Sequence, residues 1–128
     1  MLATLETQKA IYEKLTEYGL NVYSTLPINA KLPYVQFTNI QLTENSNKSV
    51  KRQTYWVSLS VWCIDTTSIN IHEMTKKVLN IIDEELNLGE EFAHDNTKLT
   101  SVIFSQDELN TETVNRAIVD FEITVSEN

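Results

Sequence analysis

Two segments of the chain space their apolar residues as one face of a helix does. Residues 2–18 and 70–86 each place apolar side chains three and four positions apart, with most charged side chains on the other side. Both glycines of the chain, Gly19 and Gly89, follow these segments, where a left-handed backbone costs glycine little. The pattern therefore predicts two amphipathic helices, each followed by a glycine.

The remaining regular segments are typical of strands, because apolar and polar side chains alternate along most of them. They lie at residues 21–26, 34–43, 53–64, 98–107 and 112–125. Pro33 has no amide hydrogen to donate, so it fits the beginning of the second strand. The order is α-β-β-β-α-β-β, which predicts a single α+β domain over residues 1–128. We expect an antiparallel sheet of four to five strands with two helices against it.

The third predicted strand, residues 53–64, has large apolar side chains on both faces. One row is almost entirely apolar, and the opposite row alternates large and small side chains: Trp56, Ser58, Ser60 and Trp62. Such a strand is typical of the centre of a sheet, with a helix over one face and a second helix or a neighbouring subunit over the other. For Trp56 and Trp62 we expect packing in the core or burial at an interface, and stacking on a ligand is the alternative.

Residues 43–52 are polar and turn-prone, which predicts a long, mobile hairpin tip. Lys48, Lys51 and Arg52 lie close together in this segment. We interpret them either as solvated charges of the tip or as a docking hairpin that touches an acidic partner or lies near DNA inside a ring.

Acidic residues outnumber Lys and Arg by 18 to 10, which gives a net charge of −8. This balance argues against binding to a nucleic-acid backbone, because such binding depends on Lys and Arg that displace counterions. Six carboxylates occur between residues 83 and 95 without a Lys or Arg among them: Asp83, Glu84, Glu85, Glu90, Glu91 and Asp95. They predict a solvated helix end and loop, or alternatively a charged docking surface.

The chain shows no pattern typical of a membrane or secreted protein. No apolar run approaches the ~20 residues that a spanning helix needs, and the N-terminal residues lack a basic segment followed by an apolar one. The single cysteine, Cys63, agrees with a reducing compartment. We therefore expect a soluble protein that has no contact with a membrane.

Few residues are candidates for catalysis: Cys63, His72 and His94, with Asp65 or Asp95 as partner. Cys63 belongs to the apolar row of a central strand, which is typical of a small buried side chain. No spacing matches a zinc or calcium site, and two glycines are too few for a phosphate loop. We expect no enzyme activity, no cofactor and no metal.

Three short motifs carry a resemblance to a known family. They are "NVYSTLP" at residues 21–27, "LPYV" at 32–35 and "SVWC" at 60–63, the last placed ahead of the second helix. In this order the chain resembles the tail completion or tail terminator proteins of long-tailed, non-contractile bacteriophages (siphoviruses). The resemblance covers most of the chain as an order of elements, and its motifs rest on Pro33, Tyr34, Val35, Val61 and Trp62. Cys63 departs from the small polar residue that commonly follows the tryptophan in that family.

The resemblance implies a structural role. Family members form a hexameric ring that caps the finished tail tube, ends its polymerisation and helps to join the tail to the head. The implied partners are further copies of this chain, the tail tube protein and a head-tail connector protein of the neck, with DNA only passing through the lumen. The implied location is the tail-neck of a virion, after synthesis in the cytoplasm of a bacterial host.

Site residues follow from this resemblance as hypotheses. Lys48, Lys51 and Arg52 would form the docking hairpin, and Tyr34, Trp56 and Trp62 would pack in the core or between subunits. The acidic lumen or docking surface would consist of Asp83, Glu84, Glu85, Glu90 and Glu91. Two alternatives stay open: another head-tail connector ring, such as a stopper or joining protein, and a small dimeric module that binds a ligand or peptide.

Overall fold

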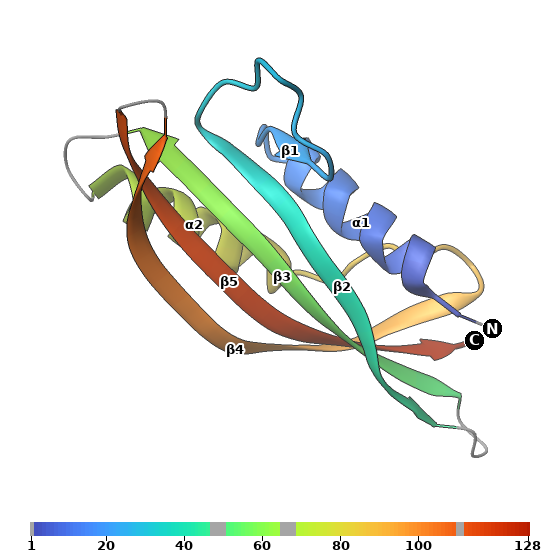
Figure 1. The fold of residues 1–128 in the computed structure, drawn as a ribbon. Coiled ribbons are helices and arrows are strands. Elements are labelled where there is room, and N and C mark those ends of the chain that lie inside the picture. Colours follow the sequence, from blue (N-terminus) through green and yellow to red (C-terminus); the bar gives the residue numbers. More distant parts are fainter. Residues whose placement is uncertain (1, 47–50, 65–68, 110–111) are drawn as a thin grey trace.

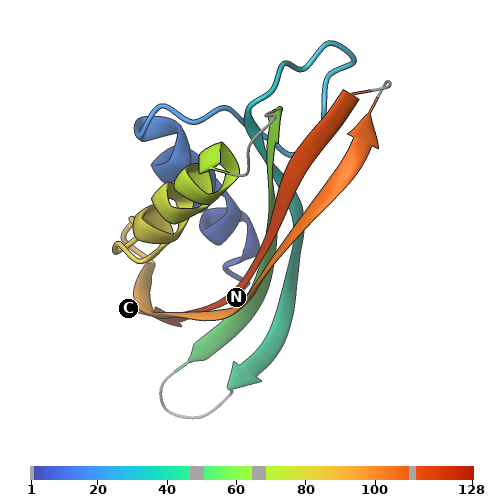
Figure 2. The ribbon, with the colours of Figure 1, turned by 90° about the vertical axis from the view of Figure 1, so that its left-hand side faces the viewer.

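The computed structural model describes residues 2–46, 51–64, 69–109 and 112–128 (Figure 1). Its strands are β1 (Val22–Tyr23), β2 (Tyr34–Ser46), β3 (Arg52–Ile64), β4 (Phe92–Leu109) and β5 (Glu112–Glu127). They form one sheet in the order β1-β2-β3-β5-β4, and helices α1 (Thr4–Glu17) and α2 (Ile69–Ile82) lie together on one side of it (Figure 2). The α+β class and the element order are confirmed.

The sheet is mixed, so the expectation of a purely antiparallel sheet is wrong at one edge. β1 pairs in parallel with β2, whereas every other strand pairing among the described residues is antiparallel. The chain leaves β1, turns through Pro27, whose carbonyl accepts a hydrogen bond from the Ala30 N–H at 3.1 Å, and returns to start β2 in the same direction. β1 is therefore a two-residue strand, shorter than the predicted 21–26.

Two other boundaries differ from the sequence pattern. α2 ends at Ile82, and β4 begins at Phe92, six residues before the predicted strand, because polar residues at its start still pair with the end of β5. Tertiary pairing overrides their weak alternation. In the hairpin, β2 and β3 pair as far as Ser46 and Arg52, so the ladder extends into the segment expected to be a tip. Residues 47–50 of that tip, including Lys48, lie outside the described residues.

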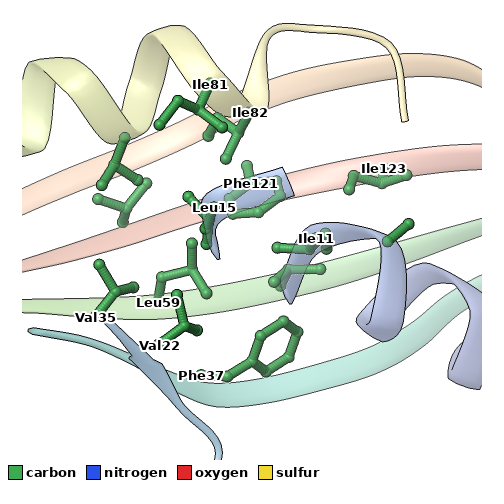
Figure 3. Packing of buried hydrophobic residues seen from close by; sticks show 14 of the residues in the cluster. Ile11, Leu15, Val22, Val35, Phe37, Leu59, Ile81, Ile82, Phe121 and Ile123 are labelled. Carbon is green, nitrogen blue, oxygen red and sulfur yellow. The ribbon is translucent and has the colours of Figure 1, made fainter. Parts of the chain in front are cut away.

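The hydrophobic core lies between the sheet and the two helices. Ile11 and Leu15 of α1 and Ile81 of α2 point toward Leu59 of β3 and Phe121 of β5, and all five are at most 2% exposed (Figure 3). Each such side chain contributes about 1.5–3 kcal/mol by leaving water. Alternation in β3 and β5 places every second residue of both strands in this layer, so the helices need only one face of the sheet.

Helix α1 is held at both ends by contacts that compensate for its free backbone groups. At its C-terminus the Gly19 N–H bonds to the Thr16 carbonyl at 2.9 Å and the Leu20 N–H to the Leu15 carbonyl at 3.2 Å, a Schellman motif with Gly19 at φ +86°. This confirms the predicted role of Gly19. Gly89 also has φ +86°, but it lies in the loop seven residues beyond α2.

The N-terminal end of α1 is fixed by β3. The buried Ala3 N–H donates to Gln53 Oε1 at 3.0 Å and to the Tyr55 hydroxyl oxygen at 3.1 Å, and that hydroxyl donates to Gln53 Oε1 at 2.6 Å. Thr4 Oγ1 also donates to the Tyr55 hydroxyl, at 3.2 Å. Ala3 has no side chain that can cap a helix, so residues about fifty positions away provide the polar partners.

We predict that Tyr55→Phe lowers the free energy of unfolding by about 1–2 kcal/mol, because it removes these hydrogen bonds inside the core and keeps the ring. Chemical denaturation of the purified protein measures the loss. Tyr12→Phe on the exposed side of α1 is the matched control, and its change should stay within about 0.5 kcal/mol. Equal losses in both variants would contradict the role of the Tyr55 hydroxyl.

Candidate functional site

The candidate site is the open face of the sheet, by which we mean the face turned away from both helices (Figure 2). Opposite residues of paired strands share a face, and Trp62 of β3 pairs with Tyr34 of β2 and with Arg116 of β5. These three side chains therefore form one row across the open face, near the end of the sheet opposite the β2–β3 hairpin. The expectation of a second helix over this face is wrong, and a neighbouring subunit remains the other expectation.

Arg116 lies over Trp62 and ties the row together. Its guanidinium carbon is 4.6 Å from the centroid of the Trp62 ring, a cation–π contact. Arg116 Nη2 donates to Ser60 Oγ at 3.0 Å, and Nη1 lies 3.9 Å from an Asp107 carboxylate oxygen. The Tyr34 ring is 6.5 Å from that of Trp62, and burial raises the pKa of Tyr34. The sheet's own side chains thus cover part of the open face.

Three buried polar atoms of this face have no hydrogen-bond partner among the described residues. They are Trp62 Nε1, Arg116 Nε and Asp120 Oδ1. A buried donor or acceptor without a partner costs about 1–3 kcal/mol, and more when the group is charged. The open face therefore gives up stability that a fully satisfied surface would keep. Sequence reasoning missed Arg116 and Asp120, whose only signal was their place in the polar row of the last predicted strand.

Trp56 lies on the same face but far from the Trp62 row. It pairs with Gln41 of β2 and Glu122 of β5, and it lies six positions before Trp62 along β3. At about 3.3 Å per residue the two tryptophans are roughly 20 Å apart. One small ligand cannot stack on both, so the two indoles do not form a joint small-molecule site. Both side chains are partly buried, so neither is a fully buried core residue nor a fully exposed one.

The two described basic residues of the predicted docking hairpin have acidic partners in their own chain. Lys51 Nζ lies 3.6 Å from a Glu127 carboxylate oxygen, and Arg52 Nε donates to Asp95 Oδ2 at 3.2 Å. Lys51 and Arg52 are both exposed, so each ion pair contributes about 1 kcal/mol at most. The two ion pairs hold the base of the hairpin beside the start of β4 and the end of β5. Both basic side chains remain accessible to solvent.

Four of the five predicted acidic residues are exposed: Asp83, Glu85, Glu90 and Glu91. All five lie in the loop between α2 and β4. Glu84 differs because it accepts a hydrogen bond from the Tyr18 hydroxyl at 2.7 Å and lies 3.8 Å from Lys14 Nζ. That hydrogen bond is the main reason why the pKa of Tyr18 is raised. The loop therefore presents four carboxylates to solvent and uses the fifth to attach itself to α1.

His94 joins this loop to β4. The Leu86 N–H donates to His94 Nδ1 at 2.9 Å, so Nδ1 is unprotonated, and Nε2 lies 2.7 Å from Thr97 Oγ1. Burial lowers the pKa of His94, while the nearby carboxylates of Glu85 and Asp95 act in the opposite direction. The imidazole is a hydrogen-bonding bridge between two segments, which sequence reasoning had named only as a candidate catalytic group.

The three candidate catalytic residues, Cys63, His72 and His94, each contact different partners and do not form one site. Cys63 is 4% exposed and its sulfur lies 3.3 Å from that of Met74 in α2, and the His72 ring packs 4.3 Å from that of Phe104. In the described ranges, no group of three or more His, Cys, Asp or Glu side chains is arranged to hold a metal ion. None of the helices in these ranges has the length and apolar character needed to cross a membrane.

Comparison with solved structures finds the same fold in a virion. A chain of the structure described as "Virion of native gene transfer agent (GTA) particle" superposes with a TM-score of 0.75. The match covers 93% of this chain and 93% of that chain, at 16% sequence identity. No family model and no curated protein sequence matches the chain. The similarity is therefore one of fold, extending over nearly the whole of both chains.

We predict that the His94 bridge stabilises the fold at neutral pH and loses this effect in acid. Above the ordinary pKa of 6.5 the imidazole is neutral in the folded and unfolded states, and the full stabilisation is present. Because folding lowers the pKa, the unfolded state binds the proton first, and the stabilisation is lost as pH falls through the folded value. Unfolding free energies of wild type and His94→Gln, from about pH 8 to about pH 5, should converge in acid. Parallel curves would contradict the prediction.

Proposed function

We propose that this chain is a structural protein of a phage-like virion, and that it caps the end of the tail tube as a ring. The observation that carries the proposal is a fold shared over 93% of both chains with a component of a gene transfer agent virion. The motifs "LPYV" and "SVWC" favour the tail terminator proteins of siphoviruses within this class. The proposed role is non-enzymatic and needs no cofactor.

The open face supports an assembly role. It carries two partly exposed tryptophans and buried polar atoms that lack partners among the described residues. Aromatic and arginine side chains are enriched where proteins contact one another. A surface of this kind, held on a sheet whose other face is filled by helices, suits a protein whose purpose is to contact other subunits.

In the proposed mechanism, copies of the chain join head to tail into a hexamer that fits the end of the tail tube. A heterologous contact repeated by a closing rotation gives a ring rather than a filament. The hairpin between β2 and β3, with Lys51 and Arg52 at its base, docks on the tube or on a neck protein. The bound ring then covers the surface to which the next tube subunit would add, so tail growth ends.

The exposed carboxylates have a place in this mechanism. If Asp83, Glu85, Glu90 and Glu91 face the lumen, their charge repels the DNA backbone, so the genome passes without binding. The alternative placement is at the surface that meets the neck. Glu84 is a poor contributor to either role because Lys14 and Tyr18 already engage its carboxylate.

Two other functions compete with the terminator ring. The first is another head-tail connector ring, such as a stopper, which would also assemble from copies of this chain but at a different position in the neck. The second competing function is a dimeric module that binds a peptide. The partly exposed aromatic side chains of the open face favour this function. The separation of Trp56 and Trp62, roughly 20 Å, counts against a small ligand that stacks on both.

Deleting the coding sequence from the particle that encodes this chain separates the three functions. For a terminator we expect tails of irregular, excessive length that lack heads, because tube growth has no stop. A stopper predicts tails of normal length that remain unjoined. Normal, complete particles would contradict both ring functions and leave the binding module. Electron microscopy of the particles supplies the measurement, and expression of the wild-type chain from a plasmid is the control.

The acidic lumen is tested by charge removal at constant shape. We predict that Glu85→Gln, Glu90→Gln and Glu91→Gln together slow DNA ejection from assembled particles, because the loop no longer repels the passing backbone. Glu13→Gln, Glu17→Gln and Glu73→Gln remove the same charge from exposed positions on the helices and serve as the control. Ejection rates that change equally in both variants, or in neither, would place these carboxylates outside the lumen.

A further inference from the structure

The outer edge of β4 is long and apolar for a strand at the margin of a sheet. β4 ends the strand order, and within the described residues no other strand pairs with its outer side. Leu99, Ile103 and Phe104 are 48%, 53% and 45% exposed. The strand contains no proline and a single lysine, Lys98, although lysine and proline are the residues that protect sheet edges from further pairing. This edge is therefore open to another strand.

The opposite margin of the sheet carries a second open edge. β1 covers only Val35 and Gln36 of β2, so the outer side of β2 from residue 38 to Ser46 has no strand beside it in the described part of the chain. β2 contains no Lys, Arg or Pro. In the part of the chain that the structure describes, the sheet therefore has two free edges, one at each margin.

We infer that β4 of one copy pairs antiparallel with the free part of β2 of the next copy. Subunits of a cyclic ring share one polarity, and β2 runs toward the hairpin end of the sheet while β4 runs away from it. The two edges then meet antiparallel, as β2, β3, β5 and β4 already do within one chain. The inference rests on the proposed ring and specifies the contact that closes it.

Side chains on the helix side of the two edges match. On β4, Val102 and Phe104 pair with core residues of β5 and so face the helices, and on β2, Ile40 and Leu42 do the same against β3. Pairing places these apolar side chains next to one another and removes exposed apolar surface from water. The free stretches lie at different heights along the sheet, so the strands incline to the ring axis, as strands of closed barrels do.

A symmetric pairing of β4 with β4 of a second copy is the rival arrangement. It would produce a dimer and leave both β2 edges uncovered. Pairing β4 with β2 uses both free edges of every copy, and only this contact can be repeated from one copy to the next. The number of free edges thus favours the head-to-tail contact over the two-fold one.

Successive residues of a strand point their N–H groups to opposite sides, which gives a test with an internal control. Ser105 and Gln106 of β4 both have exposed side chains. Of the variants Ser105→Pro and Gln106→Pro, one removes an N–H directed at β5 and therefore lowers the melting temperature. The other removes an N–H directed outward, so its melting temperature stays nearly that of wild type. Ser105→Ala and Gln106→Ala control for the lost side chains.

Native mass spectrometry over a concentration series gives the assembly state of each protein. We expect a closed ring of more than two copies for wild type and for both alanine variants, and its loss in the stable proline variant. A ring that persists in the stable proline variant overturns the edge contact and leaves the proposed function standing. A wild-type dimer, or a monomer at every concentration, also overturns the inference, whereas the proposed function is decided separately by the deletion particles.

Hydrogen exchange keeps the inference testable if both proline variants fail to fold. In wild type, alternate amides from Ser101 to Glu108 should gain protection as concentration rises from monomer to ring, because outward N–H groups become paired. The amides of β3 serve as the reference, since β3 already has a paired strand on each side within one chain. Unchanged exchange along β4 in a sample that contains rings would overturn the edge contact.

Discussion

The uninterrupted pairing of β3 with β5 is the constraint on which the rest of the molecule depends. All 13 residues of β3 pair with β5 without a register shift. Because side chains alternate between faces, a slip of one residue would move the whole apolar row of both strands to the opposite face. The ladder therefore decides which face the helices cover, where the core lies and which side chains remain on the open face.

The outer strands are less regular than this centre. Register shifts occur where β2 pairs with β3 and where β4 pairs with β5, so both bulged ladders lie toward the margins. Bulges add local twist and commonly occur near sheet edges. After the shift between Leu99 and Ser101, however, β4 pairs regularly to its end. β4 is thus irregular near the hairpin end and regular from Ser101 to its end, whereas the free part of β2 contains the register shift between Leu42 and Glu44.

Sequence patterns predicted the parts of the fold that local rules control. The 3.6-residue spacing gave both helices, alternation gave the strands, and the left-handed preference of glycine gave the end of α1 at Gly19. The parts that failed depend on distant partners. The start of β4 at Phe92 needs the end of β5, and the anchoring of Ala3 needs Gln53 and Tyr55 of β3. No local pattern contains that information.

The candidate site likewise contains residues that the sequence pattern identified and residues that only the strand register brings into it. Trp56 and Trp62 were visible in the sequence as large side chains in an otherwise small, polar row, whereas Arg116 became a site residue only through the register that lays it over Trp62. Three buried polar atoms without partners among the described residues, Trp62 Nε1, Arg116 Nε and Asp120 Oδ1, belong to this face, and each costs free energy by its desolvation. A rigid centre beneath an incompletely satisfied face suits the proposed assembly role, because a face that is already ordered loses less conformational entropy when a partner binds.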